Sequence, residues 1–249
     1  MTPFDIATQG HAYLDQINNQ HDLCTACFKI VSRQQDYVEN IKVLMHQKNN
    51  FDPKRTENIT SDFIRRIIEK AGETERDEFP LLCQNTLVAL CGGLENLVKD
   101  FVAAAFLFEP DLMRKLEDRL IRFSVSSVIF GTDDERSRLL VDELYREEGA
   151  RHGQFHRLFR LLDYIDSGAL KGHWDKKLVS AISSDVDEAY EVRNAIVHHG
   201  GKVDQRLASR IPSLASAVGS TIVLDSQIFQ RYRNAISKFA WQMPELVNL

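Results

Sequence analysis

Apolar side chains recur every three or four residues along almost the whole of this chain, a pattern typical of amphipathic helices. In 249 residues there are 12 glycines and 6 prolines to interrupt it. The segment that follows Pro80 is the clearest case, because Leu87, Leu90 and Leu94 fall on one helical face. Such stripes are buried by packing helix against helix. We therefore predict an all-α fold.

The same periodicity predicts where the helices begin and end. The first is expected over residues 10–48, and the Asn-Asn pair at residues 18–19 is the one place where its pattern allows a break. A short helix over residues 63–68 is expected to end at Gly72, and Pro80 begins a long helix because proline suits a first turn. Further helices are predicted over residues 111–122, 133–146, 150–166, 174–199 and 226–242.

Two stretches depart from helical periodicity. Residues 123–130 are β-branched and rich in serine, so we expect them to be extended. Residues 213–224 are expected to form a small β-hairpin that turns at Gly219-Ser220 and returns as the apolar strand Thr221–Leu224. The predicted fold is thus all-α with one small hairpin before the last helix.

Composition limits the class of protein and its organisation. A hydrophobic content of 43% and a charged content of 27% are typical of globular chains rather than disordered ones. No apolar run approaches the ~20 residues of a membrane span, and the first residues lack a leader pattern. Four cysteines without a framework spacing fit a reducing compartment. We expect a cytoplasmic protein that makes no contact with a membrane.

The chain is long enough for one large domain or for one domain with an appendage. A charged connector over residues 73–77 separates its first helices from the rest. We predict an N-terminal helical extension over residues 1–75 and a main helical domain over residues 76–249. One continuous domain is the alternative.

The residues with the most chemical potential gather at the end of the helix predicted over residues 174–199. Arg193-Asn194 and His198-His199 lie in its last two turns, and Gly200-Gly201 follows as a stop signal. Histidine titrates near neutral pH, and arginine is always charged and holds phosphate oxygens. With no obvious metal site nearby, these residue types suit the cleavage of RNA.

Helix geometry restricts how these residues can cooperate. Arg193 and His198 are five residues apart, which places them roughly 140° apart around one helix. Asn194 and His198 share a face, close to Tyr190 and Glu191. Either the long arginine side chain wraps round the helix, or two copies of the helix meet and pool their residues. In the last turn the helix dipole favours a charged imidazolium, which suits an acid catalyst.

The spacing Arg193-Asn194-x-x-x-His198 resembles the R-x4-6-H motif of the HEPN superfamily, including the polar residue after the arginine. The stretch Leu87–Phe101 is similar to the long early helix of the larger HEPN proteins found near RNA-processing and defence genes. Gly200–Asp204 and the short strand before the last helix also resemble that family. The resemblance covers about residues 80–245, and residues 1–75 show none.

The resemblance implies a HEPN-like up-and-down helical bundle that acts as a homodimer, with both motifs in one cleft. It implies a metal-independent endoribonuclease without a cofactor, which leaves 2′,3′-cyclic phosphate and 5′-hydroxyl ends. His198 would be the general acid–base, Arg193 would stabilise charge on the phosphate, and Asn194 would orient the phosphate or His198. Glu95 resembles an acidic residue that some members direct towards the site.

A bacterial defence or toxin–antitoxin setting, with an inhibitor, antitoxin or defence-complex partner, rests on the family alone. Each assignment also has an ordinary alternative. Histidines before a glycine pair often form a solvated helix cap, and Glu95 is equally explained as an ion-pair partner on an apolar helix. Many HEPN domains have lost catalysis and serve as dimerisation or adaptor modules. An unrelated helical scaffold is the third alternative.

The net charge of −5 argues against RNA wrapped over the whole surface and favours one local basic cleft. Arg206 and Arg210 directly follow the motif, so we predict that they bind RNA, with His199 as a helper or a helix cap. A second basic cluster, over residues 151–160, is equally explained as a solvated helix face.

Cys24 and Cys27 have the C-x-x-C spacing of redox and zinc sites, but no second pair follows at a matching distance. Together with Cys83 and Cys91 they are predicted to be small buried hydrophobic residues. We therefore predict no metal site and no cofactor.

Overall fold

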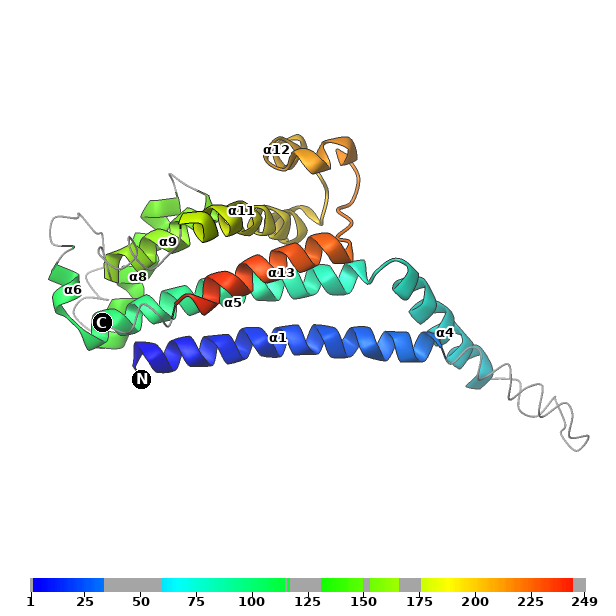
Figure 1. Cartoon of the computed structure of the whole chain (residues 1–249), viewed down its shortest axis with the longest axis horizontal. Helices are drawn as coiled ribbons and strands as arrows, with labels where there is room; N and C mark the ends of the chain where they lie inside the picture. The colour runs from blue at the N-terminus through cyan, green and yellow to red at the C-terminus, as the bar shows by residue number, and fades with distance from the viewer. Residues whose placement is uncertain are drawn as a thin grey trace, which may run out of the picture.

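The computed structural model describes residues 2–33, 60–114, 116, 131–149, 153–165 and 176–243. Within these ranges the regular elements are helices, so the predicted all-α fold is confirmed (Figure 1). The extended stretch expected at residues 123–130 and parts of several predicted helices lie outside them. The helices are α1 (Pro3–Ser32), α4 (Thr60–Arg76), α5 (Pro80–Phe108), α6 (Asp111–Arg114), α8 (Asp133–Gly149), α9 (Gln154–Ile165), α11 (Lys176–His199), α12 (Gln205–Arg210), the 3-10 helix η1 (Pro212–Ala217) and α13 (Ser226–Trp241).

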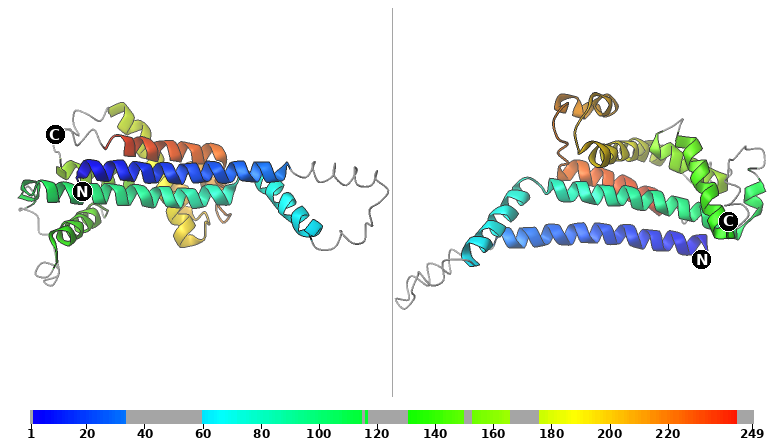
Figure 2. Two further views of the ribbon diagram at one scale, coloured as in Figure 1. Left: turned by 90° about the horizontal axis from the view of Figure 1, so that it is seen from below. Right: turned by 180° about the vertical axis from the view of Figure 1, so that it is seen from behind.

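Three helices, α1, α5 and α13, lie roughly along one axis, and α11 crosses them at a steep angle (Figures 1 and 2). α5 and α13 run in the direction opposite to α1. α5 and α13 form a middle layer, which α1 covers on one side and α11 and α9 cover on the other. α8 packs against α5 and α9, and α4 leaves the body at an angle where α1 ends. The arrangement is a helical bundle with short helices at its ends.

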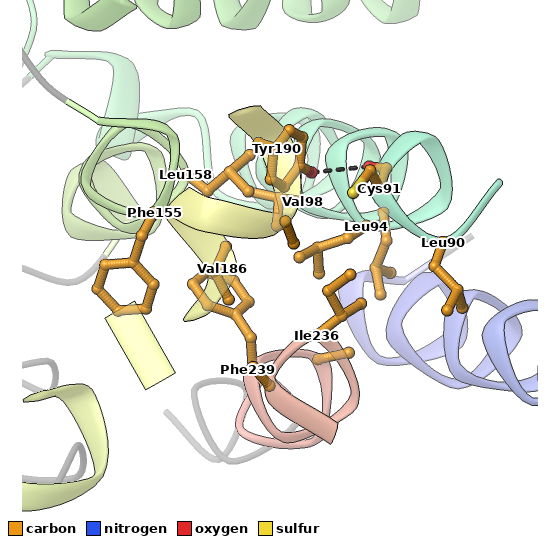
Figure 3. Close-up of a cluster of buried hydrophobic side chains, with 14 of the residues drawn as sticks. Leu90, Cys91, Leu94, Val98, Phe155, Leu158, Val186, Tyr190, Ile236 and Phe239 are labelled. Carbon is orange, nitrogen blue, oxygen red and sulfur yellow. Dashed lines mark hydrogen bonds between the residues drawn. The ribbon is translucent and has the colours of Figure 1, made fainter. Parts of the chain in front are cut away.

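α5 is the centre of the hydrophobic core because it is apolar around most of its circumference and contacts α1, α8, α9, α11 and α13. Figure 3 shows side chains of α9, α11 and α13 converging on it. The completely buried apolar side chains of α5 include those of Leu87, Leu90, Cys91, Leu94, Val98, Val102 and Phe106.

Among the described residues, no helix combines the length and apolar character that a membrane span requires.

α1 packs tightly along α5 and runs without a break through Asn18, where a break was allowed. Two glycines permit this close approach. A Cβ atom on Gly93 of α5 would lie 2.9 Å from Leu14 Cδ2, and one on Gly10 of α1 would collide with Leu97. Leu14 and other residues of α1 belong to the same buried cluster as α5.

The turn between α4 and α5 departs from the prediction. α4 does not end at Gly72 but continues to Arg76, so that boundary was wrong. Glu78 and Phe79 follow with φ angles of 59° and 57°, a left-handed conformation that is costly for residues other than glycine. Phe79 is buried, and the Glu78 carboxylate accepts hydrogen bonds from the Ser226 backbone N–H at 3.0 Å and hydroxyl at 2.8 Å. These long-range contacts hold the turn, and Pro80 begins α5 as predicted.

The small hairpin predicted over residues 213–224 is not formed. Most of its first half belongs to η1, and Thr221 instead forms an isolated antiparallel bridge with Lys202, beyond the end of α11. The Ile222 backbone N–H donates to Gly201 at 2.7 Å, and the Val203 N–H donates to Ser220 at 2.9 Å. The apolar segment therefore pairs with the chain that leaves α11 rather than with residues 213–217.

Asn18 offers a test of the packing between α1 and the middle layer. Its side-chain oxygen is buried and has no hydrogen-bond partner among the described residues, which costs about 1–3 kcal/mol. We predict that Asn18→Leu raises the free energy of unfolding by about 1 kcal/mol or more, as measured by urea denaturation. Asn19, which is exposed, is the matched control. Equal effects of Asn18→Leu and Asn19→Leu would contradict the prediction.

Candidate active site at the end of α11

α11 ends as the sequence predicts. Its last helical residue is His199, and Gly200 and Gly201 follow with φ angles of 61° and 71°. The Gly201 backbone N–H donates to the carbonyl of Ala195 at 2.9 Å, which closes the final turn. Glycine is required there because side chains disfavour positive φ. The predicted glycine stop is thus confirmed, and the chain beyond it is fixed by the bridge from Lys202 to Thr221.

Arg193 and Asn194 form a linked pair on the partly buried side of α11. The Arg193 Nη1 donates to the Asn194 side-chain oxygen at 2.9 Å. The Arg193 Nε is buried and has no hydrogen-bond partner in the described part of the chain. The guanidinium lies close enough to Cys91 and Tyr190 for its charge to lower the pKa of both groups, although burial raises both overall. Arg193 therefore lies near the core, and its Nε donor has no hydrogen-bond partner there.

His198 lies apart from this pair. It is exposed in the last turn of α11, and no described side chain forms a hydrogen bond or an ion pair with its imidazole. Within the described residues no hydrogen bond joins it to Arg193 or Asn194. The regular helix keeps Arg193 and His198 on different faces, as their spacing predicts. One chain thus presents the imidazole outwards and keeps the guanidinium at the edge of the core.

Glu95 of α5 lies near the partly buried side of α11. Its carboxylate forms an ion pair with Lys99 Nζ at 3.0 Å and accepts a hydrogen bond from the Tyr145 hydroxyl. The Tyr190 hydroxyl of α11 donates to the Cys91 carbonyl of α5 at 2.7 Å (Figure 3). The charges of Glu95 and Arg193 both act on the pKa of Cys91 and of Tyr190, the carboxylate raising it and the guanidinium lowering it. One chain thus brings Glu95 into the neighbourhood of Arg193, and within the described residues no hydrogen bond joins Glu95 to His198.

Tyr145 of α8 centres a polar network that the sequence did not reveal. Lys99 Nζ lies 4.1 Å from its ring centroid, and the Arg157 guanidinium carbon lies 3.4 Å from it. Gln154 donates to its hydroxyl, and burial raises the pKa of that hydroxyl well above its usual range. Arg157, a member of the basic cluster over residues 151–160, therefore contacts Tyr145 within the protein. No local pattern marks such a pairing, because its members come from three helices.

Arg206 and Arg210 of α12 have different surroundings. Arg210 forms an ion pair with Glu191 of α11, which ties α12 back onto the motif helix. Arg206 is exposed and forms no ion pair with a described residue. The imidazole of His199 is also exposed, and its backbone carbonyl accepts from Lys202 N–H at 3.3 Å. Of the three residues predicted to contact RNA, Arg210 thus already has an intramolecular partner.

The four cysteines lie in two different environments. Cys83 and Cys91 are buried as predicted, and burial raises the pKa of the Cys83 thiol to about 11. Cys24 and Cys27 are exposed on α1, so the prediction that all four are buried was wrong for these two. Among the described residues, no group of three histidine, cysteine or acidic side chains gathers in a geometry that could hold a metal ion.

Asp187 is a structural residue of α11 that the sequence did not single out. Its carboxylate accepts hydrogen bonds from the backbone N–H groups of Gln154 and Phe155, the latter at 2.7 Å, so it caps the N-terminus of α9. Burial raises its pKa, although these N–H groups, His156 and Arg210 oppose the shift. A cap supplied from 32 residues away leaves no local sequence signal.

Chemical denaturation can test the role of Asp187. We predict that Asp187→Ala lowers the free energy of unfolding by about 1 kcal/mol, because two N–H groups at the start of α9 lose their acceptor. Asp187→Asn is the matched control. It keeps an acceptor oxygen and removes a buried charge, so it should cost less than half as much. An Asn variant as unstable as the Ala variant would show that charge, and not capping, is what Asp187 supplies.

Comparison of this chain with protein-family models, with curated proteins and with solved structures finds no match.

Proposed function

We propose that this chain is a metal-independent endoribonuclease of the HEPN type that works as a homodimer. The observation that carries the proposal is the last two turns of α11. An exposed imidazole, His198, lies beyond an arginine–asparagine pair in which one guanidinium N–H finds no acceptor in the described chain. A guanidinium can stabilise charge on phosphate oxygens and an imidazole can transfer protons, and phosphodiester cleavage by a ribose hydroxyl uses both functions.

In the proposed reaction, the ribose 2′-hydroxyl attacks the adjacent phosphorus while a base removes its proton. The bond from phosphorus to the 5′-oxygen breaks, and an acid protonates the leaving oxygen. The products carry a 2′,3′-cyclic phosphate and a 5′-hydroxyl. His198 acts as the acid–base group, Arg193 stabilises the negative charge on the phosphate oxygens, and Asn194 holds the guanidinium in place.

A dimer resolves the geometric difficulty within one chain. Arg193 and His198 lie on different faces of α11, so a phosphate cannot contact both without a large movement of the arginine side chain. A second copy that packs against the exposed end of α11 would place its own His198 beside the first copy's Arg193. We infer that Arg206, exposed on α12, contributes to RNA binding, and we place the protein in bacterial defence or a toxin–antitoxin pair.

A non-catalytic dimerisation or adaptor module is the second candidate function, and two observations favour it. Glu95 and Arg210 are both engaged in ion pairs within the fold, with Lys99 and Glu191 respectively. Neither is free to act on RNA without breaking that pair. A surface that uses its charges internally is better suited to binding a protein partner than to binding a polyanion.

RNA cleavage by the purified protein in EDTA separates the two candidates. We predict that the wild type leaves 2′,3′-cyclic phosphate ends and that His198→Ala lowers the rate at least about 100-fold. Arg193→Ala should lower it by about 100- to 1,000-fold, because phosphate charge loses its counter-charge. The measurement is the rate of product formation, with end-group analysis, on total RNA and on tRNA.

His156→Gln is the matched control, because it removes an imidazole on α9, away from the end of α11. It should cleave at the wild-type rate. Circular dichroism must show that each variant remains folded. No cleavage by the wild type on either RNA would reject the ribonuclease and favour the adaptor module.

Mixing two inactive variants tests the shared site. If the arginine of one copy acts with the histidine of the other, an Arg193→Ala/His198→Ala heterodimer contains one complete pair. We predict that co-expression of the two variants restores roughly a quarter of the wild-type activity, since random pairing makes half of the dimers mixed and each has one intact site of two. Recovery near zero, with heterodimers shown by differential tags, would instead place the complete site within one chain.

A further inference from the structure

The face that α1 turns towards the rest of the molecule carries polar residues beside the apolar Ala7, Leu14 and Ile17. His11, Asn18, His21 and Thr25 recur at spacings of seven, three and four residues, so they form one stripe that faces the α5–α13 layer. We call these four residues the polar seam. On the other side of that layer, α11 presents apolar residues such as Val186 and Ala189. α1 therefore docks through a surface that differs in kind from the rest of the core.

The polar seam is only partly satisfied. The Asn18 side-chain oxygen and the Thr25 hydroxyl are buried, and neither has a hydrogen-bond partner among the described residues. A buried polar group without a partner makes docking less favourable. α1 lies on the outside of the bundle, where α5, α13 and α4 contact it and α11 does not. The polar seam thus contributes less to the docking of α1 than apolar residues at the same positions would.

His21 lies within the polar seam, between α5 and α13. Its Nδ1 is 3.1 Å from the Thr86 hydroxyl of α5, and its ring lies against Phe229 of α13 with centroids 4.6 Å apart. The charged groups that face it are Asp22 on α1 and Arg233 on α13. Arg233 binds both oxygens of Asp22, at 2.8 and 2.9 Å, so the carboxylate is already matched by a cation. A proton on His21 would add a second positive charge beside one carboxylate.

Burial and Arg233 lower the pKa of His21, and Asp22 opposes that shift. In released α1 the imidazole has its ordinary pKa near 6.5. Because the docked value is lower, docking is unaffected above the ordinary value and weakens as pH falls from it towards the docked value. At pH values below the pKa of docked His21, the docking of α1 does not weaken further.

His11 gives the same interface a second imidazole three turns earlier. Its Nε2 lies 2.5 Å from the Ala240 carbonyl, and its ring stacks on Trp241 with centroids 5.0 Å apart. These contacts place the two histidines of the polar seam against the start and the end of α13. Release of α1 would break both contacts together, since one straight helix carries both residues.

We propose that α1 is a pH-sensitive latch, which docks on the α5–α13 layer when His21 is neutral and is released when His21 takes a proton. The latch acts on the side of the middle layer opposite α11. It does not depend on the proposed ribonuclease function.

Hydrogen exchange of the full chain, followed by mass spectrometry at about pH 7.5 and about pH 5.5, tests the latch across the histidine range. After correction for the intrinsic pH dependence of exchange, the protection of residues 3–32 should fall at the lower pH. The expected fall is up to about tenfold for each unit that separates the released and docked pKa values. Peptides from α9 and α11 should keep their protection.

Three variants make the result specific to His21. His21→Gln keeps a hydrogen-bonding side chain that does not titrate, so the acid-induced loss of protection should disappear. His156→Gln, on α9, should leave the loss unchanged. Arg233→Gln removes the neighbouring cation and frees Asp22 to face the imidazolium, so it should reduce the acid effect even though it weakens docking at neutral pH. A merely structural Arg233 would not change the pH dependence.

Three results would overturn the latch. The first is equal protection of α1 at both pH values, and the second is an unchanged acid effect in His21→Gln. The third is an equal loss of protection in α9 and α11, which would mean that the whole bundle unfolds. If His21→Gln does not fold, Arg233→Gln decides, because an undiminished acid effect in that variant contradicts the proposal.

Discussion

The burial of α5 on all sides is the constraint on which the rest of the structure depends. A helix that is apolar around most of its circumference cannot lie at a surface, so other helices must enclose it. α1, α8, α9, α11 and α13 each contribute one face to that enclosure. Their remaining faces point outwards and carry the charged side chains. Where each of these helices meets α5 thus determines which of its side chains are exposed.

The candidate site illustrates this dependence. Val186 and Tyr190 anchor α11 in the core, and the bond from the Tyr190 hydroxyl to the Cys91 carbonyl sets its register along α5. With that register set, Arg193 falls at the edge of the core and His198 falls in solvent. The same contact brings Glu95 of α5 into the neighbourhood of Arg193, although Glu95 is already paired with Lys99 on its own helix. A site that needs both faces of α11 must therefore recruit a second chain or a large movement of Arg193.

The two outer layers differ in what attaches them to the middle layer. α11 holds to it through apolar side chains, and ion pairs at its flanks, such as Arg231 with Asp185 at 3.5 Å, add to that hold. α1 holds through apolar residues such as Leu14 and Ile17 and also through the polar seam. The proposed catalytic residues and the titratable His21 of the proposed latch therefore lie on opposite sides of the middle layer.

The sequence by itself determined the features that depend on neighbouring residues. Helical periodicity identified the long helices, Pro80 marked the start of α5, and Gly200-Gly201 marked the end of α11, because these signals act within one or two turns. The faces of Arg193 and His198 also followed from spacing alone. The residues of the candidate site could therefore be predicted from the sequence, and the residues that surround them could not.

Tertiary structure decided what depends on partners far along the chain. Glu191 neutralises Arg210 across 19 residues, and Asp187 caps a helix that begins 33 residues earlier in the sequence. Thr221 pairs with Lys202 instead of completing a hairpin, and Cys27 lies exposed although its spacing suits a buried position. Each outcome depends on which helix faces lie together, and that is set by the enclosure of α5 rather than by any local pattern.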